Sequence, residues 1–372
     1  MFARTCKLLI NLAVFAELPG TFRLMHKLQD WKSRVRSRWL SVYLPAGPEI
    51  VQAGLVLFGL ALLTGCAGFA ASQGPQLKLR EVHPFGATSL AFSSTGDRLA
   101  SGGQMGEVLI WSMPSGDRLP VLKAHHQPVK DLLWIDKDHL LSRDEHGDIF
   151  VWDTSSRRVV ASLPNQDVTA VAFLPDRRQL IVGDASGGLR SLSYPGFELL
   201  AAAVVGMSIT SIAVEPDNSA MAVSSSDGNV RMFDRALRLL RMMQRPPGKV
   251  FELRFSPDGR WLAGGGWFRL FLWNTATGAL QVRSVAHSGK IVSLDYSPDG
   301  RQMATIGRIF DARLLLTDTV SGKVLRRLQA PPLCGWRVRY SPDGRMVGAS
   351  SENGSVYLYD VTIPYKPTWY HD

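Results

Sequence analysis

Cysteine is scarce in this sequence. Only three occur among 372 residues, at Cys6, Cys66 and Cys334, and the first two precede a repeated region. A single thiol within that region cannot form an internal disulfide, so the fold there must be held by its hydrophobic core. We expect Cys334 to be buried and unreactive.

Catalytic motifs are absent as well. The sequence holds no G-x-S-x-G nucleophile elbow, no H-E-x-x-H zinc motif, no paired cysteine ligands and no phosphate-binding loop. The residue pattern therefore does not indicate catalysis, and we expect a protein that is not an enzyme and has no cofactor.

Acidic residues are outnumbered by basic ones. Lys and Arg total 42 against 32 Asp and Glu, which gives a formal net charge of +10. The first 65 residues hold eight of the basic and three of the acidic residues, so +5 remains downstream. This charge permits contact with anionic lipid or an acidic protein and, without base-stacking or phosphate motifs, does not indicate nucleic acid.

The apolar run near the amino terminus is too short to span a bilayer. Ala53 to Leu63 has eleven residues without a polar side chain, whereas a membrane-spanning helix needs about 20. The run follows a basic segment, Lys27 to Arg38, and leads into Leu63-Thr64-Gly65-Cys66. This order is typical of an export signal, and the last four residues resemble a bacterial lipobox. The alternative is a buried apolar segment with a chance cysteine.

The lipobox resemblance implies that Cys66 is lipidated and becomes the first mature residue. More than one acyl chain would anchor the protein stably to a membrane. Ala67 and Gly68 replace the aspartate that signals inner-membrane retention, so we expect the periplasmic face of the outer membrane. Residues 1–65 would be the leader, within which we expect the true translation start, and residues 66–75 would be the lipidated cysteine and a short tether.

One unit recurs seven times between Thr88 and Asp360. Its third strand ends 40 to 44 residues after that of the preceding unit, at Trp111, Trp152, Leu192, Phe233, Trp273, Thr317 and Tyr359. The first strand alternates apolar and polar residues, as in "SLAFS" and "SLDYS". This period predicts the blades of a β-propeller.

Two turn signals accompany the repeat. The first is "SPDG" at Ser256, Ser297 and Ser341, in which proline presets φ and aspartate bonds its own backbone. The second is a glycine in the hairpin before the third strand, at Gly106, Gly147, Gly187, Gly228 and Gly354. Units five and six replace this hairpin with "GGGWFRL" and "GRIFDARL".

The ring is expected to close through the start of the repeated region. The last unit ends after its third strand at Asp360, while Gln76 to His83 matches the fourth-strand segments of other units. Closure also removes an unpaired sheet edge. The sequence predicts an all-β, seven-bladed propeller over residues 76–361, with a tail at 362–372.

With seven such units the chain resembles the Trp-Asp (WD) repeat family over about four-fifths of its length. TolB-like propellers share the "SPDG" turn, but the aromatic-Asp endings at Trp152, Phe233 and Tyr359 favour the WD-repeat family. The resemblance implies a seven-bladed WD-repeat propeller, a rigid ring that displays many loops on one face.

The same resemblance implies a hydrogen-bond set of histidine, serine or threonine, aspartate and tryptophan within a repeat. Unit two contains His125, Ser142 and Trp152, with His146 where aspartate is expected. Unit six contains His287, Thr305 and Asp311, with Thr317 in place of tryptophan.

A metal site is a weaker hypothesis. His125 and His126 precede unit two, and Asp144, Glu145 and His146 lie in its hairpin, so that imidazole and carboxylate groups suited to zinc would meet on one face. The alternative, which we favour, is that His125 is structural and the others are solvated turn residues, so we expect no metal.

The irregular hairpins of units five and six indicate a partner-binding patch. Aromatic and arginine residues, which dominate binding hot spots, gather there and in the next loop at Trp267, Phe268, Arg269, Arg308, Phe310, Arg313 and Trp336. The alternative is that Trp267 and Phe268 fold inward over Gly264 to Gly266.

These observations predict a lipid-anchored, monomeric, non-catalytic propeller of the bacterial envelope that acts as a scaffold for another protein. Because one fold hosts many functions, two alternatives stay open. One is a periplasmic lactonase or hydrolase with histidines and carboxylates converging in the channel. The other is a cytosolic regulator whose leader is not a true signal.

Overall fold

The computed structural model describes residues 73–80, 82–164, 166–284, 287–309, 311–331 and 333–364. The predicted lipidation site Cys66 and the patch residue Phe310 lie outside these residues, as does most of the predicted tail. The described part belongs to one compact unit, Ala70–Asp372. It contains no helix long and apolar enough to cross a membrane.

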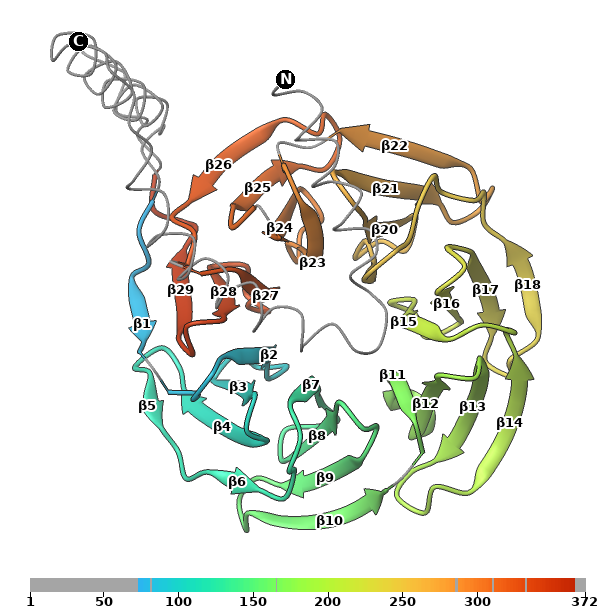
Figure 1. The fold of residues 1–372 in the computed structure, drawn as a ribbon, viewed down its shortest axis with the longest axis horizontal. Coiled ribbons are helices and arrows are strands. Elements are labelled where there is room, and N and C mark those ends of the chain that lie inside the picture. The colour runs from blue at the N-terminus through green and yellow to red at the C-terminus, as the bar shows by residue number, and fades with distance from the viewer. Residues whose placement is uncertain are drawn as a thin grey trace, which may run out of the picture. The chain divides into compact units, whose positions relative to one another are not determined.

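Seven antiparallel sheets stand radially around a central channel, with the first strand of each innermost (Figure 1). Blade 1 comprises β2 (Ala87–Phe92), β3 (Arg98–Gly103), β4 (Glu107–Ser112), β5 (Asp117–Arg118) and β6 (Leu122–Lys123). Blade 2 comprises β7 (Val129–Trp134), β8 (His139–Asp144), β9 (Ile149–Asp153) and β10 (Arg158–Leu163). Blade 3 comprises β11 (Val168–Leu174), the 3-10 helix η1 (Pro175–Arg177), β12 (Gln179–Asp184), β13 (Gly188–Ser193) and β14 (Leu199–Val204). Both β5 and β6 pair with β4, since Pro120 between them has no N–H to continue one outer strand.

Blades 4 to 7 complete the ring. Blade 4 comprises β15 (Ile209–Val214), β16 (Ala220–Ser225), β17 (Val230–Asp234) and β18 (Leu239–Met242), and blade 5 comprises β19 (Leu253–Phe255), β20 (Trp261–Gly265), β21 (Arg269–Asn274) and β22 (Leu280–Ser284). Blade 6 comprises β23 (Lys290–Tyr296), β24 (Gln302–Arg308), β25 (Leu314–Asp318) and β26 (Val324–Leu328). Blade 7 comprises β27 (Gly335–Tyr340), β28 (Met346–Ser351), β29 (Val356–Asp360) and β1 (Leu77–Leu79).

The predicted closure is confirmed, because β1 is the outer strand of blade 7. Leu77 pairs with Leu358 and Leu79 with Val356, antiparallel. Gln73 adds a bridge to Leu328 of blade 6, and its side-chain amide donates to the Asp360 carbonyl at 2.6 Å. The start of the repeated region therefore joins the last two blades.

The core lies between blades. In one cluster, Leu174 and Ile181 of blade 3 pack with Met221 and Val223 of blade 4, and all four are fully buried. Burying each such side chain contributes about 1.5–3 kcal/mol. Because each cluster of this kind needs the facing sheet, a blade alone would leave it in water.

The "SPDG" turns owe their shape to local hydrogen bonds. In blade 5, the Ser256 hydroxyl donates to Asp258 Oδ1 at 2.6 Å and accepts the Trp261 N–H at 3.0 Å. Gly259 follows at φ 70°, which an L-residue adopts at a cost. The turn therefore closes on its own side chains.

The glycine hairpins lie beside the loops that lead into the next blade. A Cβ on Gly106 would lie 2.3 Å from the His125 carbonyl oxygen, and one on Gly354 would lie 2.0 Å from that of His83. Glycine is needed for this contact as well as for its positive φ. These hairpins and loops together form one face of the ring, which we call the hairpin face.

Candidate functional site

Blade 6 contains the hydrogen-bond set predicted for unit six. His287 Nδ1 lies 2.8 Å from Asp311 Oδ2, and its Nε2 lies 2.8 Å from Thr305 Oγ1. All three residues are buried. Thr317, which stands in the tryptophan position, donates to the Met303 carbonyl at 3.3 Å.

In blade 2 the expectation that His146 replaces the aspartate of the set is wrong, because the set contains an aspartate, Asp144. Asp144 Oδ2 lies 3.0 Å from His125 Nδ1, and Ser142 Oγ lies 2.7 Å from Nε2 and accepts the Trp152 indole N–H at 2.8 Å. Asp144 ends β8, and the turn that follows holds its carboxylate through the His146 N–H at 3.1 Å. His146 itself is exposed.

Blade 1 contains a third set that the sequence analysis missed. His83 lies 2.7 Å from Glu107 Oε1 and 2.8 Å from Ser101 Oγ, which also accepts the Trp111 indole N–H at 2.9 Å. Glutamate takes the place of aspartate, which hid the set. The available signal was His83 itself, which precedes His125 by one repeat period.

These contacts account for the residues of the metal hypothesis. Both ring nitrogens of His125 and the carboxylate of Asp144 are engaged in the blade 2 set, while His126 and His146 are exposed. Within the described ranges no group of three or more His, Cys, Asp or Glu side chains is arranged to hold an ion. Cys334, expected to be buried, is partly exposed because it lies in the loop before β27.

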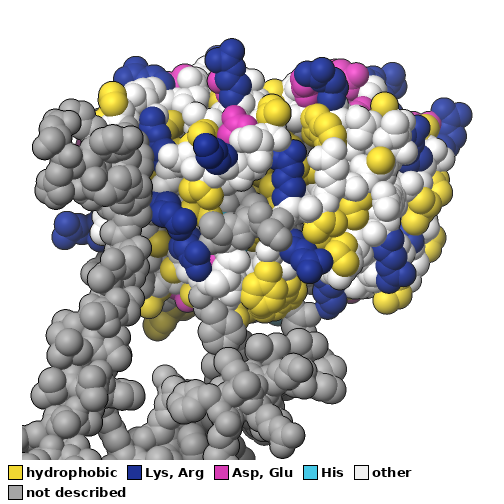
Figure 2. All heavy atoms as spheres, turned by 90° about the horizontal axis from the view of Figure 1, so that it is seen from above, with side chains coloured by type: hydrophobic (Ala, Val, Ile, Leu, Met, Phe, Trp, Pro, Cys, Tyr) yellow, Lys and Arg dark blue, Asp and Glu magenta, His cyan; other side chains and the backbone are white. Residues whose placement is uncertain are grey.

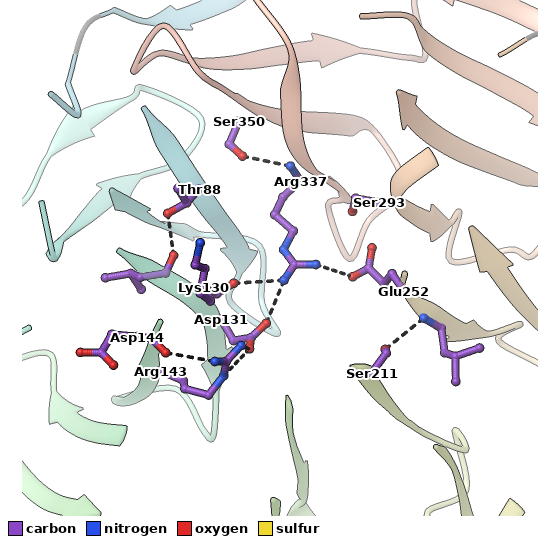
Figure 3. Close-up of polar contacts among 12 residues, drawn as sticks. Thr88, Lys130, Asp131, Arg143, Asp144, Ser211, Glu252, Ser293, Arg337 and Ser350 are labelled. Atoms are coloured by element: carbon purple, nitrogen blue, oxygen red, sulfur yellow. Dashed lines mark hydrogen bonds and ion pairs between the residues drawn. The ribbon is translucent and has the colours of Figure 1, made fainter. Parts of the chain in front are cut away.

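The central channel contains a network of ion pairs that the sequence did not indicate. Arg337 of blade 7 reaches across it (Figure 3), with Nη2 2.9 Å from Asp131 of blade 2 and Nη1 3.2 Å from Glu252, which precedes blade 5. Nη2 also donates to the Lys130 carbonyl at 3.0 Å. One side chain thus links three blades.

Glu252 is the centre of this network. Its Oε1 lies 2.8 Å from Arg339 Nη2 and 3.2 Å from Arg254 Nη2, and its Oε2 accepts the Leu294 N–H at 3.0 Å. Burial alone would raise the pKa of Glu252, but the charges of Arg339, Arg254 and Arg337 outweigh it and hold that pKa well below its usual range. The side chain is therefore an ion-pair partner at neutral pH.

Asp131 is held in the same way. Burial opposes its charge, but Arg143 and then Arg337 lower the pKa of Asp131 below its ordinary value, and Arg143 Nε donates to Asp131 Oδ2 at 2.7 Å. The adjoining cavity has a volume of about 100 Å³, and no histidine is among the described residues that line it. The convergent histidines that the periplasmic-enzyme alternative requires are thus not found around this cavity.

The two aromatic residues in the irregular hairpin of blade 5 differ in burial. Trp267 is half-buried against Phe251, with ring centroids 6.3 Å apart, whereas Phe268 beside it is 50% exposed. The Phe268 N–H donates to the Gly289 carbonyl at 2.9 Å. Inward packing therefore holds for Trp267 and not for Phe268, and Arg269 is exposed.

The remaining patch residues lie on blades 6 and 7. Arg308 stacks on the Trp336 ring, 3.4 Å from its centroid, and its Nε lies 3.0 Å from Glu352 Oε1. The Trp267 backbone forms an isolated antiparallel β-bridge with Lys290, and Lys290 is the cross-strand neighbour of Arg308 in the blade 6 sheet. Because Arg308 stacks on Trp336, Trp267 and Trp336 belong to one continuous strip. Arg313 instead bonds Asp311 and Ser288, next to the His287 set.

Of the two faces of the ring, the hairpin face carries more large exposed hydrophobic side chains, while a further eleven described ones lie on or beside the outer strands. Six described ones lie in the turns and loops of the hairpin face: Phe85, Met105, Met207, Phe268, Ile309 and Leu333. The opposite face has Val320 in a turn and Ile363 after β29. The six come from blades 4, 5, 6, 7 and 1, which are neighbours in the ring.

Three of these six hold a backbone conformation that L-residues rarely adopt. Phe85, Phe268 and Ile309 have φ of 65°, 60° and 55°. Phe268 stands at the hairpin position that is glycine in blades 1 to 4 and 7, whereas Phe85 lies in the loop before β2. Such a conformation costs about 1–2 kcal/mol per residue. The fold therefore keeps an apolar side chain in water at strained positions, which is typical of functional surfaces.

Comparison with known proteins accords with this geometry. The model for the WD domain, G-beta repeat, matches residues 74–112, 205–234, 238–274 and 322–360. The chain carries WD40 repeats. Together with the seven closed sheets, this confirms the predicted fold, a seven-bladed WD-repeat β-propeller.

Relatives of this WD-repeat propeller include eukaryotic proteins. It is 22% identical to the rat (Rattus norvegicus) serine-threonine kinase receptor-associated protein over 287 residues, 72% of this chain and 80% of that protein. It is 25% identical to human WD repeat-containing protein 55 over 151 residues, 39% of each chain. It is 36% identical to ASTRA-associated protein 1 of Yarrowia lipolytica over 70 residues, 19% of this chain and only 16% of that protein.

Proposed function

We propose that this WD-repeat propeller is a non-catalytic scaffold that binds another protein through its hairpin face. The observation that carries the proposal is that six large exposed hydrophobic residues lie in the turns and loops of this face, against two on the opposite face, and that three of the six are at positive φ. Exposed apolar groups set among polar ones are typical of protein-binding surfaces. The name of the receptor-associated relative also indicates association with another protein.

The contact would centre on blades 5 and 6. Phe268 and Ile309 present apolar side chains, and beside them Lys290, Arg308 and Trp336 form a basic and aromatic strip. Aromatic and arginine side chains supply much of the energy at protein interfaces. An apolar segment flanked by acidic residues would complement this surface.

Site-specific photocrosslinking tests this assignment. A photoreactive residue at Phe268 should capture one recurrent protein, whereas the same residue at Val320, 83% exposed on the opposite face, should not. The double variant Phe268→Asn and Ile309→Asn, which keeps a residue tolerant of positive φ, should lose that protein while remaining folded. Capture by the folded double variant at the unchanged level would reject the proposal.

We also propose that the chain is a lipoprotein of the bacterial envelope, anchored through Cys66 at the periplasmic face of the outer membrane. The support is the order of basic segment, apolar run and lipobox-like residues in the sequence. A scaffold tethered by lipid would hold its partner at the membrane surface.

Metabolic labelling with a fatty-acid analogue tests the anchor. The unchanged protein and Cys6→Ala should be labelled and sediment with membranes, whereas Cys66→Ala should be unlabelled. Absence of label from the unchanged protein would instead favour a cytosolic regulator.

A further inference from the structure

The cavity in the central channel is lined by more positive than negative side chains. The described residues around it include four arginines and two carboxylates: Arg143, Arg254, Arg337, Arg339, Asp131 and Glu252. Asp295 adds a third carboxylate, with Oδ1 3.6 Å from Arg254 Nε. One guanidinium charge is therefore left without a matching carboxylate. Charges that are largely buried are normally paired, because an unpaired one loses its hydration.

This gathering of arginines differs from the outer surface of the ring. On the side seen in Figure 2, Lys and Arg side chains are spread among hydrophobic and acidic ones, where water and salt screen them. In the channel, the guanidinium groups of Arg143 and Arg337 both approach Asp131 (Figure 3). The side chains of Arg254 and Arg339 are only 29% and 16% exposed. The positive charge of the channel is therefore less screened than that of the rim.

Two polar groups that line this cavity can donate further hydrogen bonds. Arg254 Nε makes none with the described residues, since Asp295 Oδ1 at 3.6 Å lies beyond hydrogen-bond distance. Ser89 is 1% exposed and lines the same cavity, and its hydroxyl has no partner in the described part of the chain. Guanidinium N–H groups only donate, and a hydroxyl can donate. A negatively charged acceptor in the cavity would suit both groups and offset the excess charge.

We propose that the channel binds a small oxyanion of the size and charge of inorganic phosphate, held by Arg254, Arg337 and Arg339. One nitrogen of each arginine lies within 3.2 Å of Glu252 Oε1. Since a guanidinium has five N–H donors, each arginine has others to offer, and their fork geometry matches the oxygens of phosphate or carboxylate. A cavity of about 150 Å³ holds benzene, so this one, at about 100 Å³, suits phosphate and is too small for a nucleotide.

The oxyanion would enter from the face opposite the hairpin face. A second cavity, with a volume of about 330 Å³, shares Leu132, Leu133, Arg254 and Arg339 with the first. Its lining also includes prolines of the "SPDG" turns, Pro298 and Pro342. These turns join the first and second strands of a blade, whereas the hairpins join the second and third, so the two lie at opposite ends of the blade. A protein on the hairpin face would therefore not compete with the oxyanion.

Thermal unfolding and titration calorimetry of the full-length protein in mild detergent test the site. In a Tris chloride buffer, inorganic phosphate should raise the melting temperature along a saturable curve, because a ligand that binds only the folded state stabilises it. Calorimetry should show a single phosphate bound per chain. Sodium chloride at equal ionic strength is the control for screening and should not reproduce the shift. Absence of saturable phosphate binding, or an equal shift with chloride, would overturn the proposal.

Two variants of Arg254 test the assignment of the site. Arg254→Gln should weaken phosphate binding about tenfold or more, because a hydrogen bond to a charged group is lost. Arg254→Lys keeps the positive charge that Glu252 and Asp295 face but lacks the Nε donor, and it should weaken binding severalfold. The matched control is Arg235→Gln, whose arginine pairs with Asp176 outside the channel and which should bind as the unchanged protein does. Undiminished binding by either Arg254 variant in folded form would refute the site.

Discussion

Replacing Glu252 by glutamine should destabilise the propeller strongly. Three arginines, Arg254, Arg337 and Arg339, lie within 3.2 Å of its Oε1, and its side chain is only 6% exposed. Glutamine keeps the volume and one acceptor oxygen for the Leu294 N–H. Its amide NH2 then takes the place of the oxygen that faces the arginines, so the change removes both the charge and the acceptor of those three ion pairs. Breaking a buried pair by removing one partner costs about 3–5 kcal/mol.

Asp131 still lies 2.9 Å from Arg337, and Asp295 of β23 lies 3.6 Å from Arg254. We therefore expect the lower end of that range, a loss of about 3 kcal/mol in the free energy of unfolding. At about 2–4 °C per kcal/mol for a domain of this class, the melting temperature should fall by about 6–12 °C. Urea unfolding and calorimetry of the full-length protein measure both quantities. The control is Asp176→Asn, which removes an exposed pair with Arg235 at 3.2 Å and should cost under about 1 kcal/mol.

The pH dependence provides an independent check. The arginines hold the pKa of Glu252 well below its usual range, so its ion pairs contribute their full stabilisation above the unfolded value of about 4.3. That contribution shrinks as the pH falls from there towards the folded pKa. The deficit of Glu252→Gln should be complete at pH 7 and shrink below about pH 4. Equal unfolding midpoints for the variant and the unchanged protein at pH 7 would refute this reasoning.

Two further predictions concern the blade 2 histidine and the hairpin glycines. Burial lowers the pKa of His125, so below about pH 6.5 the unfolded chain takes up a proton before the folded one does. The urea midpoint of the unchanged protein should therefore fall from pH 7 to pH 5, and that of His125→Gln should depend less steeply on pH. An identical pH dependence for the two proteins would contradict this. Gly354→Ala should cost about 2–5 kcal/mol, because the positive-φ strain of about 1–2 kcal/mol adds to about 1–3 kcal/mol for a Cβ that would meet the His83 carbonyl oxygen at 2.0 Å. Gly206→Ala, at φ 89° with open space around it, should cost only the strain of about 1–2 kcal/mol, and equal melting temperatures for the two variants would contradict the steric argument.

Part of the hydrogen bonding within repeats could be predicted from the sequence, and the predictions that were wrong have identifiable physical reasons. The blade 6 set was predicted in full because His287, Thr305 and Asp311 each match a position of the motif. In blade 2 the position counted as the aspartate was His146, whereas Asp144, two residues earlier, reaches the histidine because the hairpin folds its carboxylate back. The direction of the Asp144 side chain depends on the geometry of the turn, which the spacing of residues in the sequence does not determine.

The binding surface was predictable only in outline. The irregular hairpins drew attention to Trp267 and Phe268, but only packing against Phe251 separated the buried ring from the exposed one. Arg313 matched the pattern of the patch yet is engaged with Asp311. Exposure depends on neighbours from other blades, and these are distant in the chain.

The sequence by itself determined the number of blades, their order and the closing strand, because a repeat of an amphipathic unit allows few ways to bury its faces. Tertiary structure alone decided what lies in the channel. Asp131, Glu252 and Arg337 occur in three different repeats and fit no shared motif, yet the circular arrangement brings their charges within 3.2 Å across the axis. Contacts between blades that are not neighbours in sequence arise from ring closure, and no local pattern records them.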